Sequence, residues 1–170
     1  MSITTLAINI AAPLPKLESF DRYLFIGPHP DDIEIGAGAT AAKLVSAGKN
    51  VAFLCCIDGR YGSNTAAPEE LIPIRQAEAK ASAAALGVTD IRFLPFCDGG
   101  FYEPDELKSA IAKVVGEFKP DVIFCPDPQV RSECHPDHLN VGRAASEIAY
   151  FAPYEGIMQR RGAAPAPVKA

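Results

Sequence analysis

Two short segments of the chain contain the residue types that bind metals and move protons. Residues 28–34 hold one histidine and three acids: His29, Asp31, Asp32 and Glu34. Carboxylates this close repel one another unless a cation or bound protons relieve them. Residues 133–138 hold the other two of the chain's three histidines, His135 and His138. Because histidine nitrogen and aspartate oxygen are good zinc ligands, the two segments together predict a divalent-metal site, with zinc as the expected metal.

Each segment also has a simpler interpretation. Asp31 or Asp32 could cap a helix that begins near residue 36, and Pro136 could begin the last helix of the chain. A receiver-type signalling domain would also carry paired acids after its first strand, with Asp98 as the phosphoacceptor. That class of domain does not need the histidines, so the metal site is favoured.

The elements that must position these segments follow from hydrophobic patterning and from glycine and proline punctuation. Strands are expected at residues 23–26, 50–57, 90–94 and 122–125, and helices at 36–47, 70–86, 104–118 and 136–150. This alternation predicts an α/β fold: a doubly wound, Rossmann-like parallel sheet with helices on both faces, forming a three-layer sandwich. With an assumed strand order of 3-2-1-4, the first and fourth strands are neighbours, and the loops after them share one crevice.

Composition limits the class of protein. The chain has 170 residues, 48% of them hydrophobic, and a net charge of -5, which is typical of one globular domain and offers no basic surface for nucleic acid. It contains no apolar run of the roughly 18 residues that a membrane span needs. The apolar stretch within residues 1–16 has no basic flank, so a signal peptide is not expected. Five cysteines without a CxxC pair indicate a cytoplasmic protein.

Taken together, the two segments resemble the LmbE-like family of zinc deacetylases, which includes the PIG-L N-acetylglucosaminyl-phosphatidylinositol deacetylases. Residues 28–34 are similar to the family motif Ala/Pro-His-Pro-Asp-Asp-Glu, with the last acid displaced by one place, and Ala39 stands where glycine is usual. Residues 135–138 give the second motif, His-Pro-Asp-His, in full. Weaker similarities lie between the motifs, around residues 58–63, 75–87 and 93–99, so the resemblance covers residues 21–151.

The resemblance implies a role for each position of the two motifs. The metal ligands would be His29, Asp32 and His138. They would hold Zn²⁺, and Fe²⁺ or another divalent metal could use the same ligands. Asp31 would be the general base, a protonated His135 would stabilise the oxyanion or donate to the leaving amine, and Asp137 would orient His135.

Other positions have both a functional and a simpler interpretation. Arg75 and Asp98 would contact the substrate, but Arg75 could be a plain partner of Glu78 and Asp98 a turn residue. Tyr61 and Asn64 are candidates to line the pocket. Cys134 is a weak candidate for a fourth ligand.

The function that the resemblance implies is hydrolysis of an N-acyl group, usually acetyl, by zinc-activated water. The expected substrate is a small N-acetylglucosamine-type sugar or a related N-acyl amine. The alternative is a non-catalytic or incomplete domain that acts in binding or assembly. Family members are usually longer, so residues 1–170 are expected to form one domain, either whole or truncated at the C-terminus. Residues 160–170 are a linker or tail, or else the approach to another strand. In the second case a C-terminal segment that closes the pocket is missing, and apolar sheet surface left exposed would promote association into a homo-oligomer.

Overall fold

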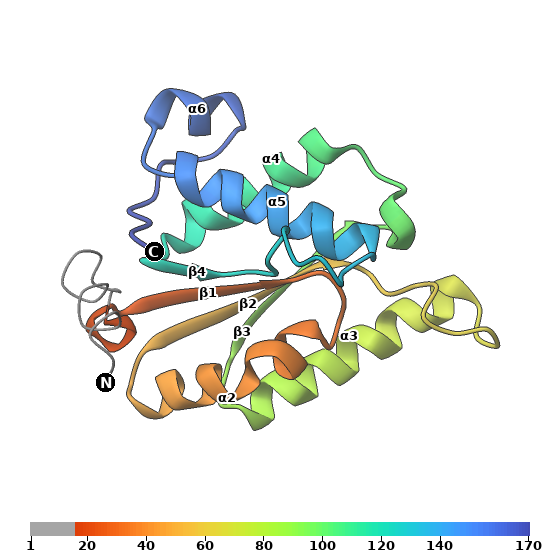
Figure 1. The fold of residues 1–170 in the computed structure, drawn as a ribbon. Helices are drawn as coiled ribbons and strands as arrows, with labels where there is room; N and C mark the ends of the chain where they lie inside the picture. Colours follow the sequence, from red (N-terminus) through yellow and green to blue (C-terminus); the bar gives the residue numbers. More distant parts are fainter. Residues whose placement is uncertain (1–15) are drawn as a thin grey trace.

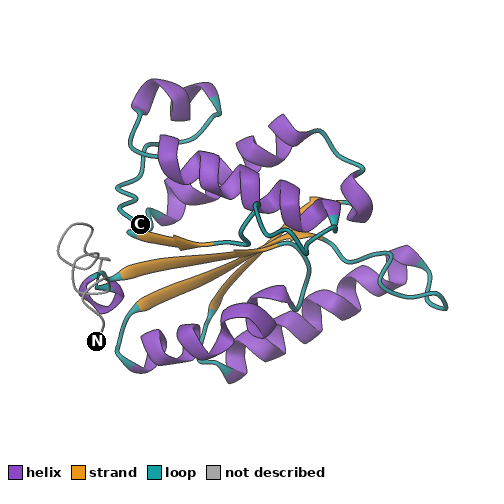
Figure 2. Ribbon diagram, viewed as in Figure 1, coloured by secondary structure: helices purple, strands orange, loops and turns teal. Residues whose placement is uncertain are grey.

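A four-stranded parallel sheet lies between two layers of helices in the computed structural model, which describes residues 16–170 (Figures 1 and 2). The strands are β1 (Arg22–Gly27), β2 (Asn50–Ile57), β3 (Asp90–Phe96) and β4 (Val122–Phe124). The helices are α2 (Asp32–Ser46), α3 (Pro68–Ala85), α4 (Pro104–Phe118), α5 (Pro136–Phe151) and α6 (Glu155–Arg160), with short 3-10 turns η1 (Leu17–Ser19) and η2 (Asp98–Gly100). The predicted α/β three-layer fold is confirmed.

Side chains of β1 alternate between two hydrophobic cores, as a central parallel strand requires. Leu24 and Ile26 pack toward α4 and α5, whereas Tyr23 and Phe25 pack on the other face with α2. Figure 1 shows the same division, with α4, α5 and α6 above the sheet and α2 and α3 below it. Because both faces of the sheet are covered, the positions of its strand ends are fixed by packing on two sides.

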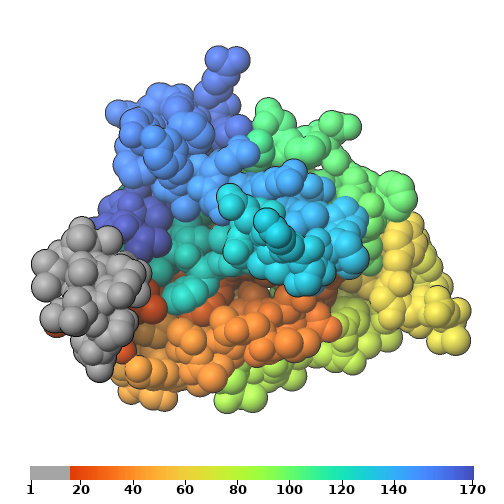
Figure 3. Space-filling model, viewed as in Figure 1, coloured from red at the N-terminus to blue at the C-terminus, as the bar shows by residue number. Residues whose placement is uncertain are grey.

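The strand order is β3-β2-β1-β4, so the assumed order is confirmed. β1 pairs in parallel with β4, and Phe25 lies opposite Phe124. The segments that follow these two strands therefore leave the sheet at the same edge. In the space-filling view, α2 (orange) and the segment after β4 (cyan) lie against each other on the surface (Figure 3).

The helix after β1 begins at Asp32, four residues before the predicted start at residue 36. Asp31 occupies the N-cap position, but its side chain makes no capping hydrogen bond. Asp32 and Glu34 lie in the first turn, where the positive end of the helix dipole favours acids. The backbone N–H of His29 donates to Asp32 Oδ2 at 2.8 Å and holds this carboxylate beside the end of β1.

The C-terminal residues do not form a free linker or tail. The backbone N–H of Ala166 donates to the carbonyl of Ala152 at 2.8 Å, and Ala166 is buried. Further on, Lys169 N–H donates to Asp121 O at 2.7 Å, and Ile123 N–H donates to Ala170 O at 2.9 Å. The linker interpretation is therefore wrong, and the chain from Lys169 to Ala170 lies along β4.

Two predictions concern a signal peptide and membrane-spanning segments. The interpretation of the N-terminal apolar stretch falls outside the described residues, which begin at residue 16. Within residues 16–170, none of the helices is both long enough and apolar enough to cross a bilayer.

Candidate functional site

His29, Asp32 and His138 come together although more than 100 residues separate the first from the last. His29 follows β1, Asp32 begins α2, and His138 lies in the first turn of α5. One ligand atom from each of the three lies within 4.8 Å of the others. The Asp32 Oδ2 atom is 3.2 Å from His29 Nδ1 and 3.4 Å from His138 Nε2. Two imidazole nitrogens and one carboxylate oxygen at these distances could hold a divalent metal ion.

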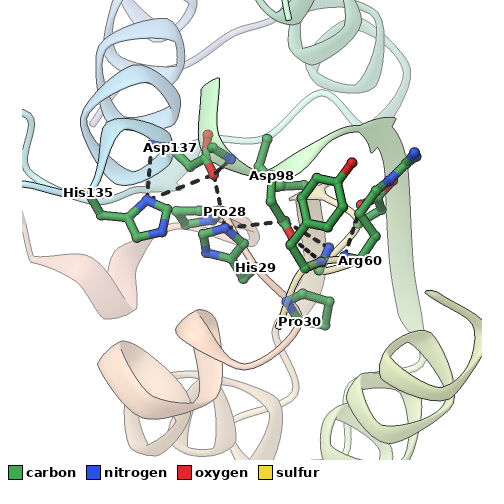
Figure 4. Close-up of polar contacts among 12 residues, drawn as sticks. Pro28, His29, Pro30, Arg60, Asp98, His135 and Asp137 are labelled. Atoms are coloured by element: carbon green, nitrogen blue, oxygen red, sulfur yellow. Dashed lines mark hydrogen bonds and ion pairs between the residues drawn. The ribbon is translucent and has the colours of Figure 1, made fainter. Parts of the chain in front are cut away.

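A second carboxylate fixes the far side of the His29 ring. His29 Nε2 lies 3.2 Å from Asp137 Oδ2 (Figure 4), and the other ring nitrogen, Nδ1, lies 3.2 Å from Asp32 Oδ2. Metal-binding histidines commonly donate their other ring N–H to a carboxylate in this way. Burial lowers the pKa of His29, but hydrogen bonds to Asp137 and Asp32 and nearby negative charge outweigh it and raise the pKa to about 9. The acids of this site therefore favour positive charge at the position between them.

Asp137 is completely buried, and its charge is compensated by four donors. Oδ2 accepts the Gly99 N–H at 2.7 Å as well as the His29 ring, and Oδ1 accepts the Gly100 N–H at 2.8 Å and the Tyr102 hydroxyl at 2.9 Å. Burial raises the pKa of Asp137, yet these hydrogen bonds prevail and lower it to about 2. Asp137 is thus an ionised anchor that joins α5 to the segment after β3 and to His29.

His135 is half-exposed and caps the N-terminus of α5. Its Nδ1 accepts the backbone N–H of Asp137 at 3.2 Å, and the same nitrogen lies 3.8 Å from Asp137 Oδ2. A ring that accepts at Nδ1 carries its proton at Nε2. Asp137 contacts His135 chiefly through its backbone, while its carboxylate is closer to His29. The expected orientation of His135 by Asp137, and its protonated state, stay predictions.

Asp31 lies beside this cluster with a side chain that is 49% exposed. Arg75 Nη2 is 2.7 Å from Asp31 Oδ2 and also donates to the Pro30 carbonyl at 3.2 Å. Arg75 Nη1 pairs with Glu78 at 2.7 Å, so the simpler interpretation of Arg75 describes one of its contacts. Because the ion pair with Asp31 engages Oδ2 alone, Oδ1 is free to accept a proton. Contact between Arg75 and a substrate stays a prediction.

Asp98 accepts backbone hydrogen bonds from the loop that follows β2. Its Oδ1 accepts the Gly59 N–H at 3.1 Å and its Oδ2 accepts the Tyr61 N–H at 2.6 Å. Oδ1 also lies 3.6 Å from His29 Nε2 (Figure 4). Both oxygens are therefore occupied by donors of the protein itself. A direct contact between Asp98 and a substrate stays a prediction.

A pocket of about 730 Å³ is lined by His29 of the three grouped residues, whereas Asp32 and His138 line a second pocket of about 380 Å³. The polar lining of the larger pocket includes His29, Asp31, Arg75, Asp98 and His135, and its apolar lining includes Tyr61, Leu71, Ile74 and Phe101. Tyr61 therefore lines the pocket as expected, whereas Asn64 is not among the lining residues. A second group of potential metal ligands consists of His29, His135 and Asp137. Cys134 is exposed and belongs to neither group. The volume of the larger pocket is in the usual range for a small-molecule site.

The hydrogen-bond donors to Asp137 were not predicted from the sequence. Gly99, Gly100 and Tyr102 belong to another loop, and the two glycines donate through their backbone N–H groups. A role for Glu133, whose carboxylate lies 2.9 Å from His138 Nδ1, was not predicted either. The signal for Glu133 was its place in the acid- and histidine-rich segment that contains His138.

Residues 24–149 match the family model described as PIG-L: GlcNAc-PI de-N-acetylase. The diacetylchitobiose deacetylase of Thermococcus kodakarensis is 37% identical over 77% of this chain and 50% of the relative. The 1D-myo-inositol 2-acetamido-2-deoxy-alpha-D-glucopyranoside deacetylase of Kineococcus radiotolerans is 31% identical over 91% of this chain and 52% of the relative. The chain thus spans about half the length of these relatives.

One solved structure is similar to this chain over its whole length. The N,N'-diacetylchitobiose deacetylase of Pyrococcus horikoshii, complexed with its inhibitor, superimposes with a TM-score of 0.79 and 29% sequence identity. The superposition covers 100% of this chain and 67% of that chain.

Proposed function

Because the chain belongs to the PIG-L (GlcNAc-PI de-N-acetylase) family, we propose that it is a metal-dependent hydrolase that removes the acetyl group from a small N-acetylglucosamine-type substrate. The observation that carries the proposal is the His29, Asp32 and His138 group, with the half-exposed carboxylate of Asp31, which lines the pocket, close in sequence to His29 and Asp32. Named relatives that act on diacetylchitobiose and on an N-acetylglucosaminyl inositol support this class of substrate.

The donor set fits zinc. It offers two imidazole nitrogens and one carboxylate oxygen, the open pattern of catalytic zinc sites, and each imidazole has its other nitrogen beside a carboxylate. When bound at such a site, zinc lowers the pKa of water to about 7 and polarises a carbonyl oxygen. Fe²⁺ could use the same ligands, so we propose zinc as the metal on the chemistry of the donors alone.

The chain's own residues would divide the proton transfers. Asp31 accepts a proton from the attacking water at Oδ1, because Arg75 occupies Oδ2 and holds the carboxylate over the pocket. His135 would donate a hydrogen bond from Nε2 to the developing oxyanion, because its Nδ1 accepts the Asp137 N–H. Proton transfer from His135 to the leaving amine would require a ring that carries a proton on both nitrogens and has released that N–H. Asp137 keeps the His29 ring in place, and Asp98 holds the loop that carries Tyr61 against the pocket.

The test is acetyl release from N,N'-diacetylchitobiose, followed as new primary amine. The full chain is stripped with a chelator, dialysed, and assayed before and after one equivalent of Zn²⁺. We expect activity only after zinc is restored, and none in His135→Ala under the same conditions. If the zinc-loaded chain releases no amine from this disaccharide or from N-acetylglucosaminyl inositol, the hydrolase proposal fails and the binding or assembly alternative is favoured.

We also propose that the protein works in the cytoplasm. All five cysteines are free thiols, and two of them, Cys55 and Cys56, are buried in the core beside β1. Free buried thiols fit a reducing compartment.

A further inference from the structure

Glu133 contacts His138, one of the three grouped potential metal ligands, at the ring nitrogen that does not face Asp32. It lies in the loop between β4 and α5, five residues before His138. Its Oε2 is 2.9 Å from His138 Nδ1, while its Oε1 accepts the backbone N–H of His135 at 2.8 Å. The Glu133 N–H donates to the Val130 carbonyl at 3.1 Å, which fixes the turn that presents this side chain. Both carboxylate oxygens are thus engaged with the motif that follows.

This contact decides which nitrogen of His138 is available to a metal. The other ring nitrogen, Nε2, faces Asp32 Oδ2 at 3.4 Å. An ionised carboxylate at Nδ1 can only accept, so it favours the tautomer with its proton on Nδ1 and its lone pair on Nε2. Among the hydrogen bonds of residues 16–170, Glu133 is the acceptor that His138 Nδ1 meets. His29 has a similar carboxylate partner, because Asp137 Oδ2 lies 3.2 Å from His29 Nε2.

We propose that Glu133 is a positioning residue that fixes the tautomer and the ring orientation of His138 and thereby raises the affinity of the site for a divalent metal. This rests on the metal-binding part of the proposed function and not on the reaction. The loop gives it a geometric basis. Glu133 ties the ring of His138 and the backbone of His135 to one carboxylate, so the two histidines of the second motif are set relative to each other.

The test compares zinc affinity in four full-length proteins: wild type, Glu133→Gln, Glu133→Ala and Asp127→Asn. Asp127 is a matched control, because it lies in the same inter-element segment and its carboxylate also accepts a backbone N–H two residues on, from Gln129 at 2.8 Å, without contact to a histidine. Each metal-free protein competes with a chromophoric chelator for Zn²⁺. We expect the dissociation constant to rise about 10- to 100-fold in Glu133→Ala, less in Glu133→Gln, and to stay unchanged in Asp127→Asn.

A second readout separates positioning from general support of the loop. Ring ¹⁵N shifts of metal-free wild type should show His138 protonated at Nδ1, and Glu133→Ala should lose that preference. Wild-type affinity in both folded Glu133 variants, or an unchanged His138 tautomer, would overturn the proposal. None of these measurements depends on turnover. If the wild-type chain binds zinc but releases no acetyl group, the hydrolase proposal fails while the role of Glu133 in metal binding is unaffected. A wild type that binds no zinc removes both.

Discussion

Asp31→Asn is expected to lower the turnover number for deacetylation by about 10²- to 10⁴-fold, the usual contribution of a general base. The same protein should bind zinc with the wild-type stoichiometry. Asp31 is not one of the three grouped ligands, and its half-exposed carboxylate faces the pocket with Oδ2 paired to Arg75. An asparagine keeps the size and can still meet Arg75, but it cannot accept a proton. Rate and metal content are measured on one preparation.

The control is Glu34→Gln, which removes a neighbouring acid of α2 that lies outside both groups of potential metal ligands. It should change the rate by less than threefold, so a loss confined to Asp31→Asn identifies the base. Two results would contradict the role of Asp31. One is unchanged turnover, and the other is a loss of zinc in Asp31→Asn, which would make Asp31 a ligand.

The second large effect is on stability. Asp137→Ala should lower the free energy of unfolding of the metal-free protein by about 3 to 5 kcal/mol, the cost of breaking a buried charge network. Asp137 is completely buried and accepts hydrogen bonds from the Gly99 and Gly100 N–H groups, from Tyr102 and from His29. Alanine would leave these donors without a partner, and a buried unmet donor is costly. Urea unfolding followed by circular dichroism gives the value.

Two variants calibrate the stability measurement. Asp137→Asn keeps one acceptor oxygen and should be less destabilising than alanine. Asp127→Ala removes an exposed carboxylate that accepts one backbone N–H, and its effect should stay below about 1 kcal/mol. If Asp137→Ala unfolds at the wild-type urea concentration with an unchanged slope, Asp137 is not the anchor that joins the two loops.

Much of the fold could be predicted from local pattern. The helix at 104–118 and the strand at 50–57 agree with the structure at both ends, because proline or glycine and hydrophobic runs mark their limits. Helix α2 begins at Asp32, four residues before the predicted start at residue 36. Its acids lie in the first turn, where the helix dipole favours them. The short helix α6 was not predicted, because six residues carry too little periodicity.

For the site, the residue types were predictable but their pairings were not. The two motifs and the order of the strands suffice to bring His29, Asp32 and His138 into one group. The partners of Asp137 depend on tertiary packing: it meets a ring that follows β1 and backbone groups that follow β3. No local spacing encodes such contacts. Of the two interpretations of residues 160–170, the linker or tail is wrong, because backbone hydrogen bonds to Asp121 and Ile123 hold Lys169 and Ala170 against β4.

The central claim, that His29, Asp32 and His138 hold one catalytic divalent metal, is tested most directly by titrating the metal-free chain with Zn²⁺ in a calorimeter. The account predicts one ion bound per chain, and at least a 100-fold weaker site in Asp32→Ala and in His138→Ala, with both variants folded by circular dichroism. A wild-type chain that binds no zinc, or ligand variants that bind it as tightly as wild type, would contradict the account.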